Sequence, residues 1–196
     1  MSFEQSKFRG VVIGGSAGSL DAFQAILQDL PASFHLPVVV VQHRASDDNG
    51  FLASFLDDSC SLGVSEAEPG EAVSPGHVYV APASYHLLLE TDGTFALTID
   101  PKYNFSRPAI DILFESAADY YHGGLLGVLL TGGSDDGTLG LKRIKELGGA
   151  TIVQDPDCAV AYLMPRSAIE AGVADFVVPL DGIAMKICDL CGVTTK

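Results

Sequence analysis

Side chains that together could perform nucleophilic catalysis follow three separate apolar runs of the chain. Ser16 follows the run VVIGG, His43 follows VVVVQ, and Asp135 and Asp136 follow GVLLTGGS. A serine hydroxyl is a weak nucleophile at neutral pH, so it needs a histidine to take its proton and a carboxylate to orient that histidine. These residue types predict a serine hydrolase, and from the residues alone either aspartate could orient His43.

The turn around Ser16 could serve either of two chemistries. The pattern Gly14-x-Ser16-x-Gly18 permits a sharp turn from strand to helix that exposes the serine hydroxyl. Backbone N–H groups just after the serine would then lie at a helix N-terminus, where they can stabilise an oxyanion. The chain order serine, histidine, aspartate differs from the order in α/β-hydrolases. We therefore expect a serine hydrolase outside that fold.

The alternative is a loop that binds the phosphates of a nucleotide. A dinucleotide fingerprint starting at Gly14 would need glycines where Ser16 and Ser19 stand, and an acidic residue where the second strand ends in His43. A P-loop would need a lysine, and none occurs between Lys7 and Lys102. Nucleotide binding therefore stays the weaker hypothesis.

Val- and Ile-rich runs alternate with segments of helical period along the chain. This pattern predicts an α/β fold with a doubly wound, mostly parallel sheet and helices on both faces. An Asp-Gly turn signal inside residues 85–100 adds an antiparallel β-hairpin, and the stretch 65–76 is expected to be a connecting loop. The expected strands cover 10–15, 36–43, 77–82, 124–132, 150–155 and 174–180, and the expected helices cover 20–30, 50–58, 108–122 (with Pro108 in its first turn), 136–149, 164–172 and 181–191.

The ends of these strands tell us where to look for a site. In open α/β sheets, ligands bind outside the carboxyl ends of the strands. Ser16, His43 and the two aspartates all follow strands directly, so we expect them at one edge of the sheet.

Length and charge limit the classes of protein to consider. The chain has 196 residues, 47% of them hydrophobic, which suits a single globular domain. It has no apolar run long enough to span a membrane, and the first ten residues lack the apolar segment of a signal peptide, so we expect a cytoplasmic protein. A net charge of −14 argues against binding to nucleic acid or to an anionic membrane surface.

The cysteines and several other polar residues have structural interpretations. Cys188 and Cys191 form a C-x-x-C pair without the further ligands that a zinc site needs, so we expect no metal and no cofactor. We expect turn roles for Asp155 and Asp157. His86 opens the hairpin and could line a substrate groove, and Arg107 is expected to form a structural ion pair. His35, His77 and His122 are expected to be surface or packing residues.

The chain resembles the catalytic domain of the chemotaxis-receptor protein-glutamate methylesterases, the CheB type, from about residue 9 to residue 190. The stretches that carry the resemblance occur in the family's order. They are VVIGGSAGSLDAF, VVVVQHR, VYVAPASYHLLLE, SRPAIDILFESAA, GVLLTGGSDDGTLGL, GGATIVQDPDCAVAYLMPRSAIEAG and ADFVVPL.

The resemblance implies an activity and a set of site residues. It implies hydrolysis of γ-glutamyl methyl esters on chemoreceptors with release of methanol, and deamidation of receptor glutamines. It places the nucleophile on Ser16, the base on His43 and the orienting acid on Asp136 rather than Asp135. Backbone N–H groups of Ala17 and Gly133 would hold the oxyanion. The implied partners are a methylated chemoreceptor or sensor protein, with a methyltransferase or response regulator as further partners.

Three departures from the family pattern keep an alternative open. The family's Ser-Thr-Gly-Gly is here Ser16-Ala17-Gly18-Ser19, and Gly133 stands where the family usually has a bulkier residue, often Met. The regulatory receiver domain common in the family is absent, so we expect residues 1–196 to form one catalytic domain. The alternative is a catalytically weak relative that binds a receptor or sensor as an adaptor in a two-component pathway.

Overall fold

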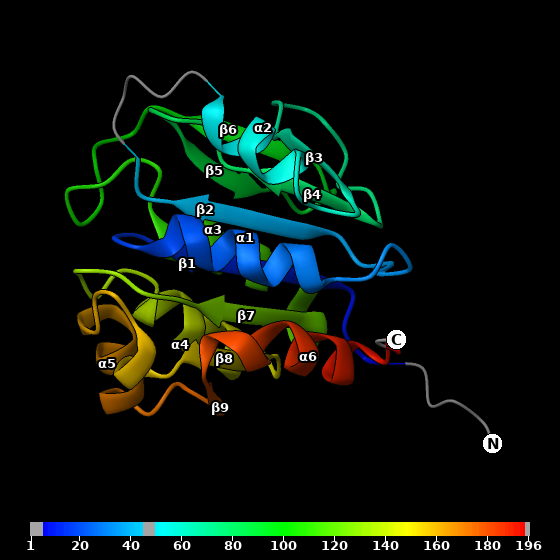
Figure 1. The fold of residues 1–196 in the computed structure, drawn as a ribbon. Helices are drawn as coiled ribbons and strands as arrows, with labels where there is room; N and C mark the ends of the chain where they lie inside the picture. The colour runs from blue at the N-terminus through cyan, green and yellow to red at the C-terminus, as the bar shows by residue number, and fades with distance from the viewer. Residues whose placement is uncertain (1–5, 45–49, 195–196) are drawn as a thin grey trace.

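The protein folds around a seven-stranded parallel sheet in the order β3-β4-β2-β1-β7-β8-β9, as the computed structural model shows for residues 6–44 and 50–194 (Figure 1). A separate two-stranded antiparallel sheet joins β5 and β6. The strands are β1 (Gly10–Gly15), β2 (Val38–Gln42), β3 (Gly63–Glu66), β4 (His77–Val80), β5 (His86–Leu89), β6 (Phe95–Thr98), β7 (Leu125–Leu129), β8 (Ala150–Gln154) and β9 (Phe176–Val178).

Helices cover both faces of the seven-stranded sheet. One apolar layer packs α1 (Ser19–Asp29), α2 (Phe51–Asp57) and α6 (Leu180–Cys191) against one face. The other packs α3 (Ile110–Tyr121), α4 (Thr138–Glu146), α5 (Leu163–Glu170) and the β5–β6 hairpin against the opposite face. Two short 3-10 turns cover His122–Gly124 and Pro156–Cys158. The expected doubly wound α/β fold is confirmed.

The burial of the central strands explains why continuous apolar runs in the sequence predicted a parallel sheet. Strands β1 and β7 are buried along their whole length, and β2 is buried as far as Val41. A parallel strand covered on both faces needs apolar side chains on both sides, so it appears in the sequence as a continuous apolar run. None of the helices found in residues 6–44 and 50–194 has the length and apolarity needed to cross a membrane. The expectation about a signal peptide falls partly on residues 1–5, which lie outside the described residues.

Two expectations about the elements were wrong in detail. Strand β3 overlaps the start of the stretch expected to be a loop, because a short, half-buried edge strand has no continuous apolar run. The antiparallel hairpin is present, as expected, and it forms its own sheet that packs on α3, where Ser116 Oγ accepts the Leu89 N–H at 3.1 Å. Pro108 precedes α3 rather than lying in its first turn, because the N–H of extended Ala109 donates to His86 Nδ1.

We predict that Gly14→Ala lowers the free energy of unfolding by about 1–3 kcal/mol, since overpacking a tight core forces neighbouring atoms apart. A Cβ on Gly14 would lie 2.5 Å from Ile110 Cγ2 and 3.1 Å from Phe114 Cζ, where β1 meets α3. Gly133→Ala is the matched control, because a Cβ there meets nothing within 4 Å. Urea denaturation of both variants measures the difference, and an equal loss of stability in the two would contradict the packing argument.

Candidate active site

Ser16 lies in a sharp turn between β1 and α1. Its N–H donates to Thr131 O at 2.9 Å, which ties the turn to the segment after β7. Gly18 then adopts a left-handed conformation, with φ of 76°, and α1 begins at the next residue. Because the chain reverses within three residues, the half-buried Ser16 side chain lies beyond the end of the sheet.

Ser19 stabilises this turn through its side chain. Its buried hydroxyl donates to Ser16 O at 2.6 Å and accepts from Gln42 Nε2 at 3.1 Å. The resemblance implies glycine at position 19, and the serine here is accommodated by two specific hydrogen bonds. This departure therefore connects the Ser16 turn to the last residue of β2.

His43 lies beside the Ser16 turn at the neighbouring strand end. Gly15 pairs with Gln42 in the sheet, and His43 N–H donates to Gly15 O at 3.2 Å. The His43 ring is 12% exposed, and its Nε2 lies 2.6 Å from Asp136 Oδ2. The other ring nitrogen, Nδ1, is left for a second partner. No hydrogen bond joins Ser16 Oγ to this ring within the described ranges 6–44 and 50–194.

Asp136 is fully buried and makes hydrogen bonds to two segments of the chain, the residue after β2 and the start of α3. Its Oδ2 accepts from Ile110 N at 2.8 Å in addition to contacting His43, and its Oδ1 accepts from Asp111 N at 2.9 Å. Burial acts to raise the pKa of this carboxyl, but the hydrogen bonds from His43, Asp111 and Ile110 outweigh it and lower the pKa. Asp136 is therefore ionised at neutral pH.

Asp135 differs from its neighbour in position. It is exposed at the start of the turn into α4, where its backbone carbonyl accepts from Thr138 N at 3.2 Å. The structure thus brings His43 to Asp136 and not to Asp135, which agrees with the choice that the resemblance implied.

Hydrogen bonds join the segment between β7 and α4 to the Ser16 turn and to residue 161. Thr131 Oγ1 donates to Ala17 O at 2.9 Å and accepts from Ala161 N at 2.8 Å, which holds these segments together. Gly132 N–H is used by Ala161 O at 2.9 Å. By contrast, the N–H groups of Ala17 and Gly133 donate no hydrogen bond within the part of the chain that the structure describes. Such uncommitted N–H groups can hold a developing oxyanion.

Two residues that position this site were not singled out from the sequence. Thr131 links the Ser16 turn to residue 161, and its own N–H is fixed by Gln154 Oε1 at 2.9 Å. Asp111 lies in the first turn of α3 and is 2% exposed. The signal that could have identified Asp111 is an acidic residue on the otherwise apolar face of that helix.

Other polar residues take structural roles. His86 is buried, with Nδ1 accepting from Ala109 N and Nε2 lying 3.2 Å from Pro101 O, so it has a structural role and does not line a substrate groove. Arg107 donates to the carbonyls of Ile99 and Asp100 at 2.7 and 2.9 Å, rather than to the carboxylate that an ion pair requires. Asp155 Oδ1 accepts from Asp157 N at 3.0 Å, which is a turn role, as expected.

The C-x-x-C pair belongs to the core. Cys188 and Cys191 lie buried on α6 against the apolar layer that contains α1. Burial raises the pKa of the Cys191 thiol to about 12 and also raises that of Cys188, so both are protonated at neutral pH. The described residues contain no group of three or more His, Cys, Asp or Glu side chains placed to hold a metal ion.

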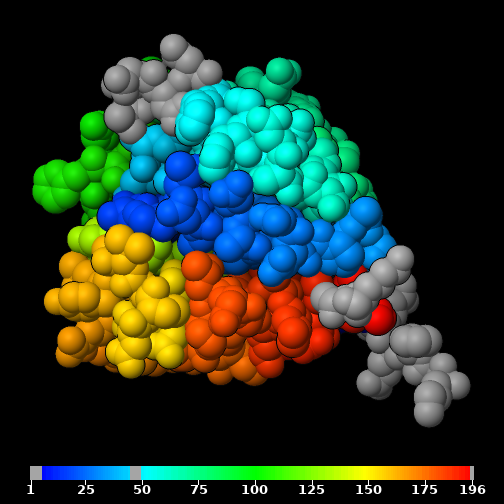
Figure 2. Space-filling model, in the orientation of Figure 1, coloured from blue at the N-terminus to red at the C-terminus, as the bar shows by residue number. Residues whose placement is uncertain are grey.

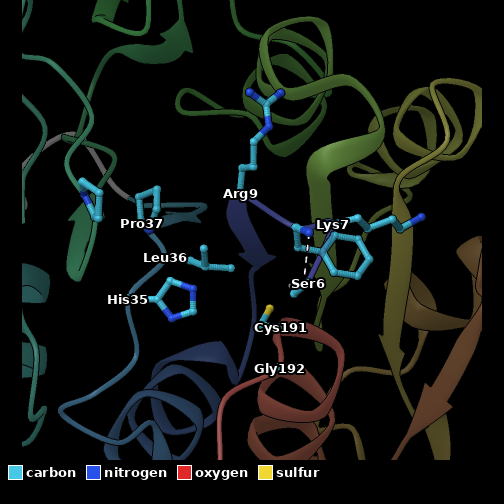
Figure 3. Close-up of a pocket in the computed structure, with 10 residues that line it drawn as sticks. Ser6, Lys7, Arg9, His35, Leu36, Pro37, Cys191 and Gly192 are labelled. Atoms are coloured by element: carbon cyan, nitrogen blue, oxygen red, sulfur yellow. Dashed lines mark hydrogen bonds between the residues drawn. The ribbon is translucent and has the colours of Figure 1, made fainter. Parts of the chain in front are cut away.

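A cavity of about 910 Å³ lies at the opposite edge of the sheet, beside the first residues of β1 and β2 (Figure 3). The two cationic side chains nearest to it point away. Lys7 Nζ donates to Gly148 O at 3.0 Å and Arg9 donates to Tyr121 O at 2.7 Å. This cavity is therefore separate from the catalytic candidates, which all lie at the carboxyl ends of the strands.

We predict that Asp136→Ala destabilises the fold by about 3 kcal/mol, because it leaves the buried N–H groups of Ile110 and Asp111 without an acceptor. Asp135→Asn is the control, since the neighbouring side chain is exposed. Thermal or urea unfolding at pH 7 compares the two. A stability of Asp136→Ala within about 0.5 kcal/mol of wild type would show that these hydrogen bonds do not hold α3 in place.

Comparison with known proteins agrees with this geometry. The model of the CheB methylesterase family matches residues 11–187. A protein of Thermotoga maritima named protein-glutamate methylesterase/protein-glutamine glutaminase is 41% identical over 92% of this chain and 53% of its own length. A Leptospira interrogans relative, which carries the same double name provisionally, is 49% identical over 90% of this chain and 92% of its own.

A solved structure extends the likeness from sequence to fold. The crystal structure of the Thermotoga maritima CheB methylesterase catalytic domain superposes with a TM-score of 0.90 at 41% identity, covering 93% of this chain and 98% of that one. With the same fold, matched sequence over nearly the whole length and a histidine–aspartate pair beside the Ser16 turn, this chain belongs to the CheB methylesterase family.

Proposed function

We propose that this protein hydrolyses γ-glutamyl methyl esters on chemoreceptors, releasing methanol, and deamidates receptor glutamines by the same route. Ser16 is the nucleophile, His43 the general base and Asp136 the residue that orients His43. The observation that carries the assignment is the 2.6 Å contact between His43 and the buried Asp136 at the strand end next to Ser16. The family membership supplies the class of substrate.

The reaction follows from the placement of these groups. Ser16 Oγ attacks the ester carbonyl while His43 takes its proton at Nδ1, the ring nitrogen that Asp136 does not use. The N–H groups of Ala17 and Gly133 hold the oxyanion of the tetrahedral intermediate. His43 then protonates the departing methoxide to give methanol. Water, deprotonated by His43, releases the glutamate side chain and restores Ser16.

Asp136 makes the proton transfer favourable. Because its carboxylate is ionised and buried against the imidazole, it stabilises the positive charge that His43 acquires and fixes the ring tautomer. A glutamine substrate passes through the same acyl-enzyme, with ammonia leaving in place of methanol. Besides the substrate and the hydrolytic water, the route uses side chains and backbone groups of the chain.

We predict that Ser16→Ala lowers kcat for methanol release by about 10⁴-fold or more, because removing one member of a catalytic triad removes the concerted mechanism. The measurement is methanol released from a methylated chemoreceptor fragment. Ser59→Ala, just after the end of α2 and outside the site, is the control and keeps wild-type activity. Methanol release that survives Ser16→Ala would contradict the assignment, and a wild-type protein that binds the receptor without releasing methanol would favour the adaptor alternative.

Three exposed apolar side chains, Val160, Leu139 and Phe105, lie on segments next to the candidate site, and we propose that this apolar rim receives the methylated receptor segment. Val160 lies against the Ser16 turn, since a Cβ on Gly18 would meet it at 2.5 Å. Leu139 is in the first turn of α4 just after Asp136. Phe105 is 96% exposed in the loop of residues 99–107, which projects as the green lobe in Figure 2 on the side where α5 and the strand ends lie. A receptor segment that presents apolar side chains beside its esterified glutamate would suit this rim.

We expect Phe105→Ser to raise KM for a methylated receptor fragment about fivefold with kcat unchanged, because an exposed aromatic anchor commonly contributes about 1 kcal/mol or more to an interface. Hydrolysis of a small soluble ester should be unaffected. Met185→Ser is the control, since Met185 is similarly exposed but lies on α6, away from the strand ends. An unchanged receptor KM in Phe105→Ser would remove the loop from the receptor-binding surface.

A further inference from the structure

Two acidic residues exchange hydrogen bonds between the starts of α3 and α4. Asp136, just before α4, accepts from the N–H groups of Ile110 and Asp111 at the start of α3. Asp111 Oδ1 in turn accepts from Gly137 N and Gly140 N, both at 2.8 Å, at the start of α4. Each helix N-terminus is thus held by an acid from the other helix. Since Gly137 follows Asp136 directly, Asp111 also fixes the backbone that carries Asp136.

The second carboxyl oxygen of Asp111 has no such partner. Asp111 Oδ2 is buried and makes no hydrogen bond within the described residues. An ionised oxygen without a donor in a dry environment is costly, whereas a protonated carboxyl is not. Burial raises the pKa of Asp111 to about 7 against the lowering effect of the Gly140 N–H, and the charge on Asp136 raises it further.

The acidic groups around Asp111 favour the protonated form of its carboxyl. Burial raises the pKa of Tyr103, in the loop before α3, and the negative charges of Asp111, Glu115, Asp136 and Asp135 raise it further. Glu115 lies one turn further along α3, and burial and the charge of Asp119 raise its pKa. Arg143 pairs with Asp119 at 2.7 Å. His43, which can become positive, contacts Asp136 at 2.6 Å.

We propose that Asp111 is a positioning residue for the hydrolysis. In its protonated, neutral form Asp111 holds the ionised Asp136 in place, and the ionisation of Asp111 controls the basicity of His43. The proposal rests on the function proposed above. When Asp111 loses its proton, its carboxylate adds a second negative charge next to the His43–Asp136 pair. That charge stabilises protonated His43, so the ring keeps its proton to higher pH and takes one from Ser16 less readily. The acid limb of the pH–rate profile therefore belongs to His43 and Asp111 jointly.

Asp111→Asn separates this role from a merely structural one. The amide oxygen of asparagine can accept the same bonds from Gly137 and Gly140, while its side chain cannot ionise. We expect His43 to lose its proton at a pH lower by at least about 0.5 unit, which makes kcat/KM on the acid limb about threefold higher than in wild type, with KM within twofold. Asp135→Asn is the matched control, since it removes an exposed charge next to Asp136, and its profile should follow wild type.

The deciding measurement is the pH titration of His43 by NMR in wild type, Asp111→Asn and Asp135→Asn, alongside the pH profile of methanol release. A lower midpoint in Asp111→Asn alone supports the proposal. Superimposed His43 titrations in wild type and Asp111→Asn would overturn it, and so would an Asp111→Asn protein that no longer folds, because the isosteric amide preserves the helix hydrogen bonds. If wild type releases no methanol, the proposed function fails while the NMR titration still tests Asp111.

Discussion

The buried carboxylate of Asp136 is the group on which the rest of the site depends. Its two oxygens accept from His43, Ile110 and Asp111, which come from the end of β2 and the start of α3. A buried carboxylate is stable only when donors replace the water it has lost. The same bonds therefore keep Asp136 ionised, start α3 and orient the imidazole. One charge thus links the stability of the fold to the chemistry of the site.

The parallel sheet provides the second constraint, because it brings distant segments to one edge. Gly15 pairs with Gln42, so the residues that follow them, Ser16 and His43, lie side by side. Thr131 then connects the Ser16 turn to the segment after β7 through Ser16 N–H and Ala17 O. These two hydrogen bonds hold the Ser16 turn and, with it, the Ala17 N–H that we propose as an oxyanion donor. Because the proposed donors are backbone N–H groups, they are present whichever side chains stand at positions 17 and 133.

The departures from the family pattern are absorbed in different ways. Ser19 replaces a glycine with a side chain that bonds Ser16 O and Gln42 Nε2. Gly133 leaves open space where a larger side chain would stand, since a Cβ there meets no atom within 4 Å. The first change adds hydrogen bonds to the Ser16 turn, and the second leaves position 133 without a side chain. Both leave the contact between His43 and Asp136 intact.

The sequence by itself determined the architecture and the location of the site. Strands buried on both faces must be continuously apolar, so the runs around Val11 and Val38 could be recognised locally, and the ends of parallel strands share one edge. Only the tertiary structure decided which side chains meet. His43 and Asp136 are 93 residues apart, and Asp136 and Ile110 are 26 apart. The sequence did not identify Asp111 and left two roles open for His86, for the same reason: the role of a buried polar side chain is set by hydrogen-bond partners from distant segments, which the local sequence does not reveal.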